Sequence, residues 1–150
     1  MKNKKKILIL YATCSGNAEL VAEAVSDGII ESEAYAEIKK AELAYATEIN
    51  EYDATILICS TWNVGLLNDN MLRFYKEMLK LDFTSKTVEV IGLGDSLHYD
   101  IFCGAADVLE EAVARVGAKQ IMPTLRIDGP VVGRLNEFKK WAEAFIQKLY

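Results

Sequence analysis

Strand-like and helix-like segments alternate along this 150-residue chain from one end to the other. Short runs rich in Ile, Leu and Val are separated by longer segments in which apolar residues recur at helical spacing. The strand-like segments are 6–11, 34–39, 55–59, 87–93 and 118–127, and the helix-like segments are 16–30, 69–81, 102–116 and 132–150. Residues 41–52 fit either a short helix or a loop. This alternation predicts an α/β fold, a doubly wound five-stranded parallel sheet with helices on both faces.

Local signals predict some helix ends and buried faces. Asn68 or Asp69 suits the N-cap of the helix over 69–81, and Gly117 suits the C′ position after the helix over 102–116. The residues of the helix over 69–81 that are predicted to face the core are Met71, Leu72, Tyr75, Met78 and Leu79.

The length of the chain predicts a single domain over residues 1–150, and no repeat or linker divides it. A net charge of −5 disfavours binding to nucleic acid and to anionic membranes, because both need a positive protein surface. The apolar run over 7–12 is too short for a secretory signal, and no segment has the length of a transmembrane helix. Three cysteines without a Cys-x-x-Cys pattern indicate free thiols in a reducing cytoplasm.

A hydroxyl-rich loop follows the first strand and opens directly into a helix. It consists of Thr13, Cys14, Ser15, Gly16, Asn17 and Ala18. Free N–H groups and the positive end of the helix dipole make such a loop an anion site. Because the loop has no lysine and no Gly-x-x-x-x-Gly-Lys pattern, it fits one terminal phosphate better than a nucleoside triphosphate with Mg²⁺. A simple helix cap is the alternative interpretation of the same residues.

Two later loops are expected at the same edge of the sheet. Ser60 and Thr61 end an apolar strand and lead into Trp62, whose ring is expected to be semi-exposed, with a core tryptophan as the alternative. The Gly-x-Gly of the third loop, 92–100, lacks the third glycine of a dinucleotide fingerprint and is expected to let the backbone approach a flat ligand. Since ligands of open α/β sheets bind beyond the carboxyl ends of strands, these loops predict a nucleotide-like cofactor.

The remaining residues predict no catalytic site and no metal site. His98 is the single histidine, and no cluster has metal-ligand spacing. Cys14 precedes a helix, which favours a thiolate, but no histidine partner is close in sequence. A phosphoacceptor receiver domain would need an acidic pair after the first strand and an aspartate after the third, where this chain has Thr13, Cys14 and Ser60.

Over essentially its whole length, the chain resembles the short-chain flavodoxins. The resemblance rests on the segments TCSGNAE, CSTWNVG and GDSLHYDIFCGAADVLEEAV, followed by LRIDG. The long insertion of the long-chain members is absent. The resemblance implies a flavodoxin-like fold, flavin mononucleotide (FMN) as the cofactor, and an electron carrier rather than an enzyme.

The resemblance also implies which residues bind FMN. The loop 13–18 would hold the phosphate, and Ser60 and Thr61 would lie near the phosphate and the ribityl chain. Trp62 and Tyr99 would cover the two faces of the isoalloxazine ring, and residues 93–95 would reach its pyrimidine edge. The implied cofactor-binding residues are Thr13, Cys14, Ser15, Gly16, Asn17, Ala18, Ser60, Thr61, Trp62, Asn63, Val64, Gly65, Leu93, Gly94, Asp95, Tyr99, Phe102 and Cys103.

Three positions depart from the family pattern. Ala18 stands where threonine is usual, so one phosphate hydroxyl is missing. Leu67 stands where many members carry a glutamate. The third loop is slightly longer before Tyr99, which makes His98 the rival for the outer face of the flavin.

The function implied by the resemblance is that of a low-potential one-electron carrier that binds FMN non-covalently and stabilises a neutral semiquinone. Stacked aromatic rings and an acidic site without lysine or arginine would penalise the anionic reduced flavin, and the Asn63 carbonyl would accept a hydrogen bond from the flavin N5–H. Larger redox proteins would dock transiently through basic faces near the flavin edge of a monomeric, cytoplasmic protein. A flavin-dependent small reductase, or a binding module without FMN, is the alternative on the same fold.

Overall fold

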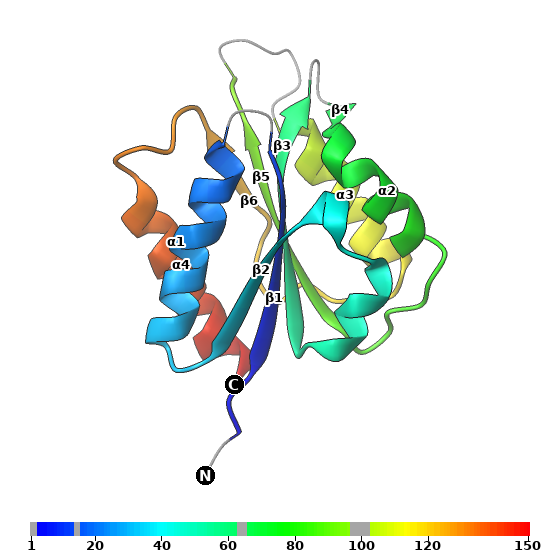
Figure 1. Ribbon diagram of the computed structural model, residues 1–150, viewed down its shortest axis with the longest axis horizontal. Coiled ribbons are helices and arrows are strands. Elements are labelled where there is room, and N and C mark those ends of the chain that lie inside the picture. Colours follow the sequence, from blue (N-terminus) through cyan, green and yellow to red (C-terminus); the bar gives the residue numbers. More distant parts are fainter. Residues whose placement is uncertain (1–2, 14–15, 63–65, 97–102) are drawn as a thin grey trace.

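The computed structural model describes residues 3–13, 16–62, 66–96 and 103–150. Within these ranges, five parallel strands form the central sheet: β1 (Lys6–Ala12), β2 (Tyr35–Lys40), β3 (Ala54–Trp62), β5 (Thr87–Gly94) and β6 (Leu125–Asp128). Their order is β2-β1-β3-β5-β6, so β2 pairs with one side of β1, and the later strands β3, β5 and β6 follow on its other side (Figure 1). The predicted doubly wound sheet is confirmed, and the strand order reverses between β1 and β3.

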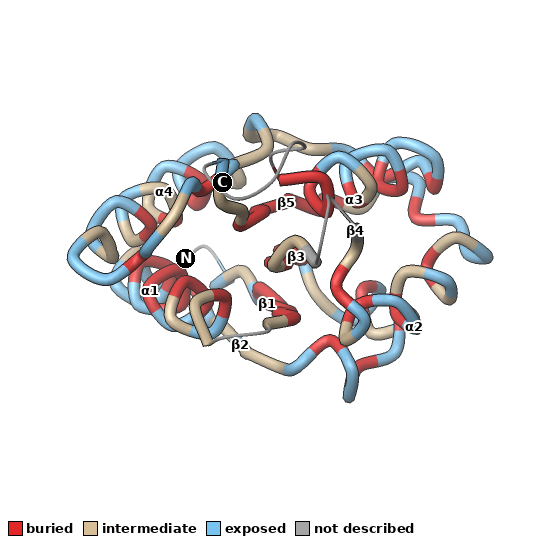
Figure 2. Tube along the Cα trace, turned by 90° about the horizontal axis from the view of Figure 1, so that it is seen from above, coloured by how far each residue is buried: buried red, intermediate tan, exposed pale blue. Residues whose placement is uncertain are grey.

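Helices cover both faces of this sheet. α1 (Asn17–Glu31) and α4 (Leu135–Leu149) pack together on one face, and α2 (Asp69–Met78) and α3 (Gly104–Arg115) lie on the other (Figures 1 and 2). The segment that fitted either a helix or a loop forms two 3₁₀ helices, η1 (Ala41–Leu43) and η2 (Ala46–Glu51). The molecule is therefore a three-layer arrangement with the sheet in the middle.

Each strand divides its side chains between two cores, because successive residues of a strand point to opposite faces. In β1, Ile7 and Ile9 belong to the core under α1 and α4, whereas Leu8 and Leu10 belong to the core under α2 and α3. All four side chains are fully buried, which explains why the strands read as continuous apolar runs. α1 and α4 come closest at Gly28, where an added Cβ would lie 2.4 Å from a backbone carbonyl oxygen of α4.

The helix predicted over 69–81 differs in its end and in its buried face. α2 ends at Met78, and Asn68 is its N-cap, whose side chain accepts a hydrogen bond from the Asn70 N–H at 2.8 Å. Phe74 is fully buried, whereas Leu72, predicted to face the core, is 36% exposed. The buried stripe of α2 is therefore centred on Met71, Phe74 and Met78, a spacing that turns Leu72 toward solvent.

The last strand is shorter than the predicted 118–127. Lys119 makes one bridge to Thr87, and regular pairing with β5 resumes only at Leu125. Residues 120–124 lie opposite residues 88–90 of β5, so the edge strand carries extra residues and its ladder is interrupted. The amides of Ile121 and Met122 donate instead to the buried carboxylate of Glu89. Pro123 lies inside this stretch, and a proline within a strand-like run is the local sign of such an interruption, because it cannot donate to the ladder.

Candidate functional site at the carboxyl edge of the sheet

The predicted loops leave the sheet at one common edge. The loops after β1, β3 and β5 all start at the carboxyl ends of parallel strands, at the top of the molecule in Figure 1. β1 and β3 are neighbours there and lie on either side of the point where the strand order reverses. That is the position at which open α/β sheets bind their ligands.

The loop between β1 and α1 has the geometry of an anion site. Gly16 adopts a left-handed conformation (φ 90°) and donates its N–H to the hydroxyl oxygen of Thr13 at 2.8 Å. No side chain caps α1 within the described part of the chain, unlike α2, which Asn68 caps. A Cβ built on Gly16 would meet no described atom within 4 Å. A helix N-terminus that no described side chain caps fits a phosphate group.

The other residues of this loop differ in burial, and two of them are not described. Asn17 is half-buried, and Ala18 is fully buried in the core under α1 and α4. Cys14 and Ser15 lie outside the described residues. The side-chain amide of Asn70 donates to the Thr13 carbonyl at 3.2 Å and ties the start of α2 to the loop. Sequence reasoning missed Asn70, because nothing local indicates a contact with a residue 57 positions away.

The second predicted loop begins later than its residue types indicate. Ser60, Thr61 and Trp62 continue β3, because the chain turns back and pairs the end of β3 with β4 (Leu66–Leu67) in antiparallel fashion. Ser60 and Thr61 are half-buried at the carboxyl edge, and the Thr61 hydroxyl accepts the Ala105 N–H at 3.4 Å. The side chain of Trp62, and Asn63, Val64 and Gly65, lie outside the residues that the structure describes.

The third loop brings Leu93, Gly94 and Asp95 to the same edge. The Leu93 side chain is buried in the core, which leaves its backbone as the part that could reach a ligand. Asp95 is half-buried at the end of β5. Tyr99 and Phe102, as well as the rival His98, lie outside the described residues.

The Gly-x-Gly of this loop also has a packing role. A Cβ on Gly92 would lie 2.4 Å from the Cβ of Ala106, and a Cβ on Gly94 would lie 2.9 Å from the backbone nitrogen of Cys103. Both glycines therefore allow the start of α3 to pack tightly on β5. The expectation that they also let the backbone approach a flat ligand stays a prediction.

Cys103 is the residue where the third loop enters α3. Its backbone is left-handed (φ 52°), its side chain is fully buried, and its Sγ lies 3.7 Å from the carbonyl oxygens of Gly92 and Ile127. Burial raises the pKa of Cys103 to about 12, so it is a protonated thiol with a packing role. Cys59 and Cys103 are both free thiols.

A second contact that sequence reasoning missed joins the ends of β5 and β6. The carboxylate of Asp128 accepts hydrogen bonds from the N–H and the hydroxyl of Ser96, at 2.9 and 2.6 Å. These bonds lower the pKa of Asp128. Arg134 donates to the backbone carbonyl of Asp128 at 2.8 Å, so a cation lies at the base of the loop that follows β6.

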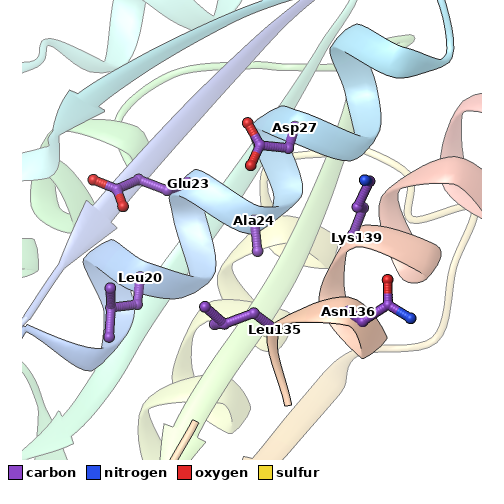
Figure 3. A pocket seen from close by; sticks show the side chains of 7 residues that line it. All are labelled: Leu20, Glu23, Ala24, Asp27, Leu135, Asn136 and Lys139. Carbon is purple, nitrogen blue, oxygen red and sulfur yellow. The ribbon is translucent and has the colours of Figure 1, made fainter. Parts of the chain in front are cut away.

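A separate hollow of about 240 Å³ lies between α1 and α4 (Figure 3). Its lining residues are Leu20, Glu23, Ala24, Asp27, Leu135, Asn136 and Lys139. None of the predicted cofactor-binding residues lines it, and its volume is below the roughly 300–1,000 Å³ usual for ligand pockets.

The described residues hold neither a metal-binding cluster nor a membrane-spanning helix. No group of three or more His, Cys, Asp or Glu side chains among them could hold a metal ion. No helix in the described ranges is both long enough and apolar enough to cross a membrane.

Comparison with known proteins agrees with the geometry. Residues 9–141 match the sequence model of the Flavodoxin family. A probable flavodoxin 2 from Bacillus subtilis (strain 168) is 36% identical over 135 residues, which cover 88% of this chain and 87% of the relative. The structure of oxidised flavodoxin 1 from Bacillus cereus superimposes with a TM-score of 0.87 at 29% identity, covering 95% and 97% of the two chains. A flavodoxin from Fusobacterium nucleatum, solved with bound FMN, has the same fold (TM-score 0.79, 21% identity, 97% and 96% covered).

The family match spans most of the chain, and the identity to the Bacillus subtilis relative extends over nearly the full length of both proteins. The helix N-terminus and the strand order that reverses beside it are also what a flavin phosphate needs. The chain belongs to the flavodoxin family, whose members bind FMN and transfer electrons rather than transform a substrate.

Proposed function

We propose that this chain binds one FMN non-covalently at the carboxyl edge of its sheet and carries single electrons between redox proteins. The observation that carries the proposal is the N-terminus of α1, which no described side chain caps and which lies beside Thr13 and the left-handed Gly16. A phosphate placed there would accept hydrogen bonds from backbone N–H groups and would face the positive end of the helix dipole. Family membership supports FMN as the ligand that supplies this phosphate.

The proposed binding residues are those assigned by the resemblance. The loop 13–18 holds the phosphate, and Ser60 and Thr61 contact the phosphate and the ribityl chain. Trp62 and Tyr99 cover the two faces of the ring, with His98 as the rival of Tyr99. Residues 93–95 reach the pyrimidine edge through their backbone. The roles of Cys14, Ser15, Trp62, Asn63–Gly65, Tyr99 and Phe102 rest on the resemblance alone. The half-burial of Thr13, Ser60 and Asp95 at one edge supports the roles of these three residues.

The proposed tuning of the cofactor comes from charge and from backbone hydrogen bonds. When bound, FMN supplies the one-electron chemistry. The half-buried Asp95 and the carboxylate of Asp128 place negative charge at this edge, which disfavours an anionic reduced flavin and lowers the potential of the second electron. The Asn63 carbonyl would accept a hydrogen bond from the flavin N5–H and so stabilise the neutral semiquinone.

The proposed partners are larger redox proteins whose basic faces dock transiently at the flavin edge. The net charge of −5 supports attraction to basic partners. We further propose that residues 1–150 act as a single FMN-binding domain, and that the protein is a cytoplasmic monomer.

A reconstitution experiment tests the proposed function. Apoprotein is titrated with FMN, riboflavin and FAD, and quenching of flavin fluorescence gives each affinity. We expect stoichiometric binding of FMN, weaker binding of riboflavin, which lacks the phosphate, and no comparable binding of FAD, for whose diphosphate the loop offers one anion site. No uptake of FMN at micromolar concentration would contradict the proposal and favour a binding module without flavin. Turnover of a substrate with a nicotinamide cofactor would favour a small reductase instead.

A further inference from the structure

The pair formed by Asp128 and Ser96 joins two strand ends across a long stretch of sequence. Asp128 is the last residue of β6, and Ser96 follows the end of β5 by two residues. One carboxylate oxygen of Asp128 accepts the Ser96 N–H at 2.9 Å, and the other accepts the Ser96 hydroxyl at 2.6 Å. The two residues are 32 positions apart and both are exposed. Exposed charged contacts add little to the stability of a fold, so stability alone gives weak reason for this arrangement.

The pair completes a set of contacts that surround the backbone of residues 94–96. The Gly129 N–H donates to the Gly94 carbonyl at 2.9 Å, directly beside the pair. On its other side, Gly94 is packed so closely against Cys103 that an added Cβ would lie 2.9 Å from the Cys103 nitrogen. Beyond Gly94, the Asp128 carboxylate holds Ser96 through both its N–H and its hydroxyl, so the pair supports the far end of this segment.

Asp128 is itself held in place from behind. Arg134 donates to the Asp128 carbonyl at 2.8 Å and to the Pro130 carbonyl at 3.3 Å. The same guanidinium bonds Glu137 at 3.2 Å in the first turn of α4 and lies over the ring of Phe138. The carboxylate thus extends from a loop that α4 anchors, and it reaches across to the segment after β5, whose Gly94 packs against the start of α3.

We propose that Asp128 is a positioning residue, which holds residues 94–96 in the one backbone conformation that receives the ring of the flavin. This inference rests on the proposed function, because residues 93–95 are the proposed contact of the pyrimidine edge. Asp128 acts through Ser96 and has no direct contact with the cofactor in this scheme. A segment ordered before binding costs less conformational entropy when the ring arrives, which is the physical source of the effect.

The chain contains a matched control for the chemistry of this pair. Asp82 accepts hydrogen bonds from the N–H and the hydroxyl of Thr84 at 2.9 and 2.6 Å, the same two lengths. Here the partners are two residues apart and order only a local turn before β5. Both carboxylates also have a pKa lowered by these bonds. Asp82→Ala removes the same contacts as Asp128→Ala, but at the opposite end of β5.

The experiment compares Asp128→Ala, Asp128→Asn, Ser96→Ala and Asp82→Ala with the unsubstituted protein. Each apoprotein is titrated with FMN and with riboflavin, its two reduction potentials are measured, and its thermal unfolding is followed. We expect Asp128→Ala to lower the affinity for FMN and for riboflavin by the same factor, about tenfold. The reason is that the ring, which both flavins share, loses its preordered contact, whereas the phosphate does not. Asp82→Ala should bind both flavins like the unsubstituted protein, whatever its unfolding temperature.

The asparagine and serine variants separate geometry from charge. Asp128→Asn and Asp128→Ala remove the same charge, but asparagine keeps one acceptor for the Ser96 N–H, so it should recover most of the affinity. Ser96→Ala keeps the charge and should weaken flavin binding by a smaller factor than Asp128→Ala. The double variant Ser96→Ala/Asp128→Ala should bind no more weakly than Asp128→Ala alone, because the two changes remove one shared contact.

Two results would overturn the inference, and they are distinguishable from failure of the proposed function. If Asp128→Ala and Ser96→Ala bind both flavins within twofold of the unsubstituted protein, the pair does not position the site. If Asp128→Asn weakens flavin binding as much as Asp128→Ala does, the residue acts through its charge alone, whatever the shift in potential. Failure of the unsubstituted protein to bind FMN would overturn the proposed function and this inference together.

Discussion

The buried carboxylate of Glu89 accepts the backbone N–H of Ile121 at 2.8 Å, inside the interrupted stretch of the edge strand. The Met122 N–H donates to the other carboxylate oxygen at 3.0 Å. One side chain thus takes the place of the ladder bonds that residues 120–124 do not make with β5. Such an arrangement is stable only while both amides keep their acceptor, because an unpartnered buried N–H group is costly.

Removing this acceptor should destabilise the fold. We expect Glu89→Ala to lower the free energy of unfolding by about 2–5 kcal/mol, since two buried amides lose their partner at about 1–3 kcal/mol each. Urea unfolding followed by circular dichroism measures this. Glu110→Ala, which changes an exposed glutamate of α3, is the control and should cost much less. Equal effects of the two substitutions would contradict the structural role of Glu89.

The same carboxylate predicts a pH dependence of stability. Burial raises the pKa of Glu89 above its ordinary value, against the opposing effect of the two amides and of Lys148. The folded state therefore keeps the Glu89 proton to a higher pH than the unfolded state, and the contribution of this group to stability falls as pH rises above about 4.3. As pH rises from 4 to 7, the unsubstituted protein should lose stability relative to Glu89→Gln, which carries no titrating group at this position. A difference that is constant with pH would contradict the raised pKa.

The hydroxyl of Thr13 should matter for the phosphate of FMN. It accepts the Gly16 N–H at 2.8 Å and so holds the loop in front of α1. Thr13→Val removes this acceptor while keeping the shape of the side chain. We expect FMN affinity to fall by about tenfold, the effect of roughly 1.4 kcal/mol, while riboflavin affinity changes little. An equal loss of affinity for FMN and riboflavin would show that Thr13 does not act on the phosphate. Fluorescence titration of both flavins gives the comparison.

The close packing of Gly92 against Ala106 predicts a compensating pair of substitutions. Gly92→Ala places a Cβ 2.4 Å from that of Ala106, so we expect a loss of about 1–3 kcal/mol from overpacking. Ala106→Gly alone should cost about 1 kcal/mol as a glycine in a helix. The double variant should be more stable than Gly92→Ala, because the second substitution removes the clashing methyl group. Additive losses in thermal unfolding would show that the two residues do not collide.

The charge of Asp95 should lower the potential at which a bound flavin takes its second electron. Asp95 is half-buried at the end of β5, beside the proposed ring contact. We expect Asp95→Asn to raise that potential by about 20–40 mV, which corresponds to roughly 0.5–1 kcal/mol of charge interaction near a surface. The shift should shrink at high salt. Asp82→Asn at the far end of β5 serves as the control, and a lowered potential in Asp95→Asn would contradict the electrostatic account.

Several features of this fold follow from sequence alone, because they arise from local pattern. The apolar runs around Ile7 and Ile56 predict buried parallel strands, and helical spacing predicts α1, α3 and α4 to within a few residues. Asn68 and Gly117 mark the helix ends that they were expected to mark, and Gly117 adopts the left-handed backbone (φ 84°) that this position favours. The loop that holds Thr13 was predicted because hydroxyl groups before a helix are visible in a short stretch of sequence.

Other features were decided only by tertiary structure, because they depend on partners that are remote in sequence. The Asp128–Ser96 pair, the Asn70–Thr13 contact and the carboxylate of Glu89 join residues 32 to 57 positions apart. The glycines at 92 and 94 look like a ligand-binding motif in sequence, yet α3 occupies the space beside them. Local pattern determined which segments become strands and helices. Only packing decided which polar groups lost access to water, and each of those groups then had to find its partner wherever the folded chain supplied one.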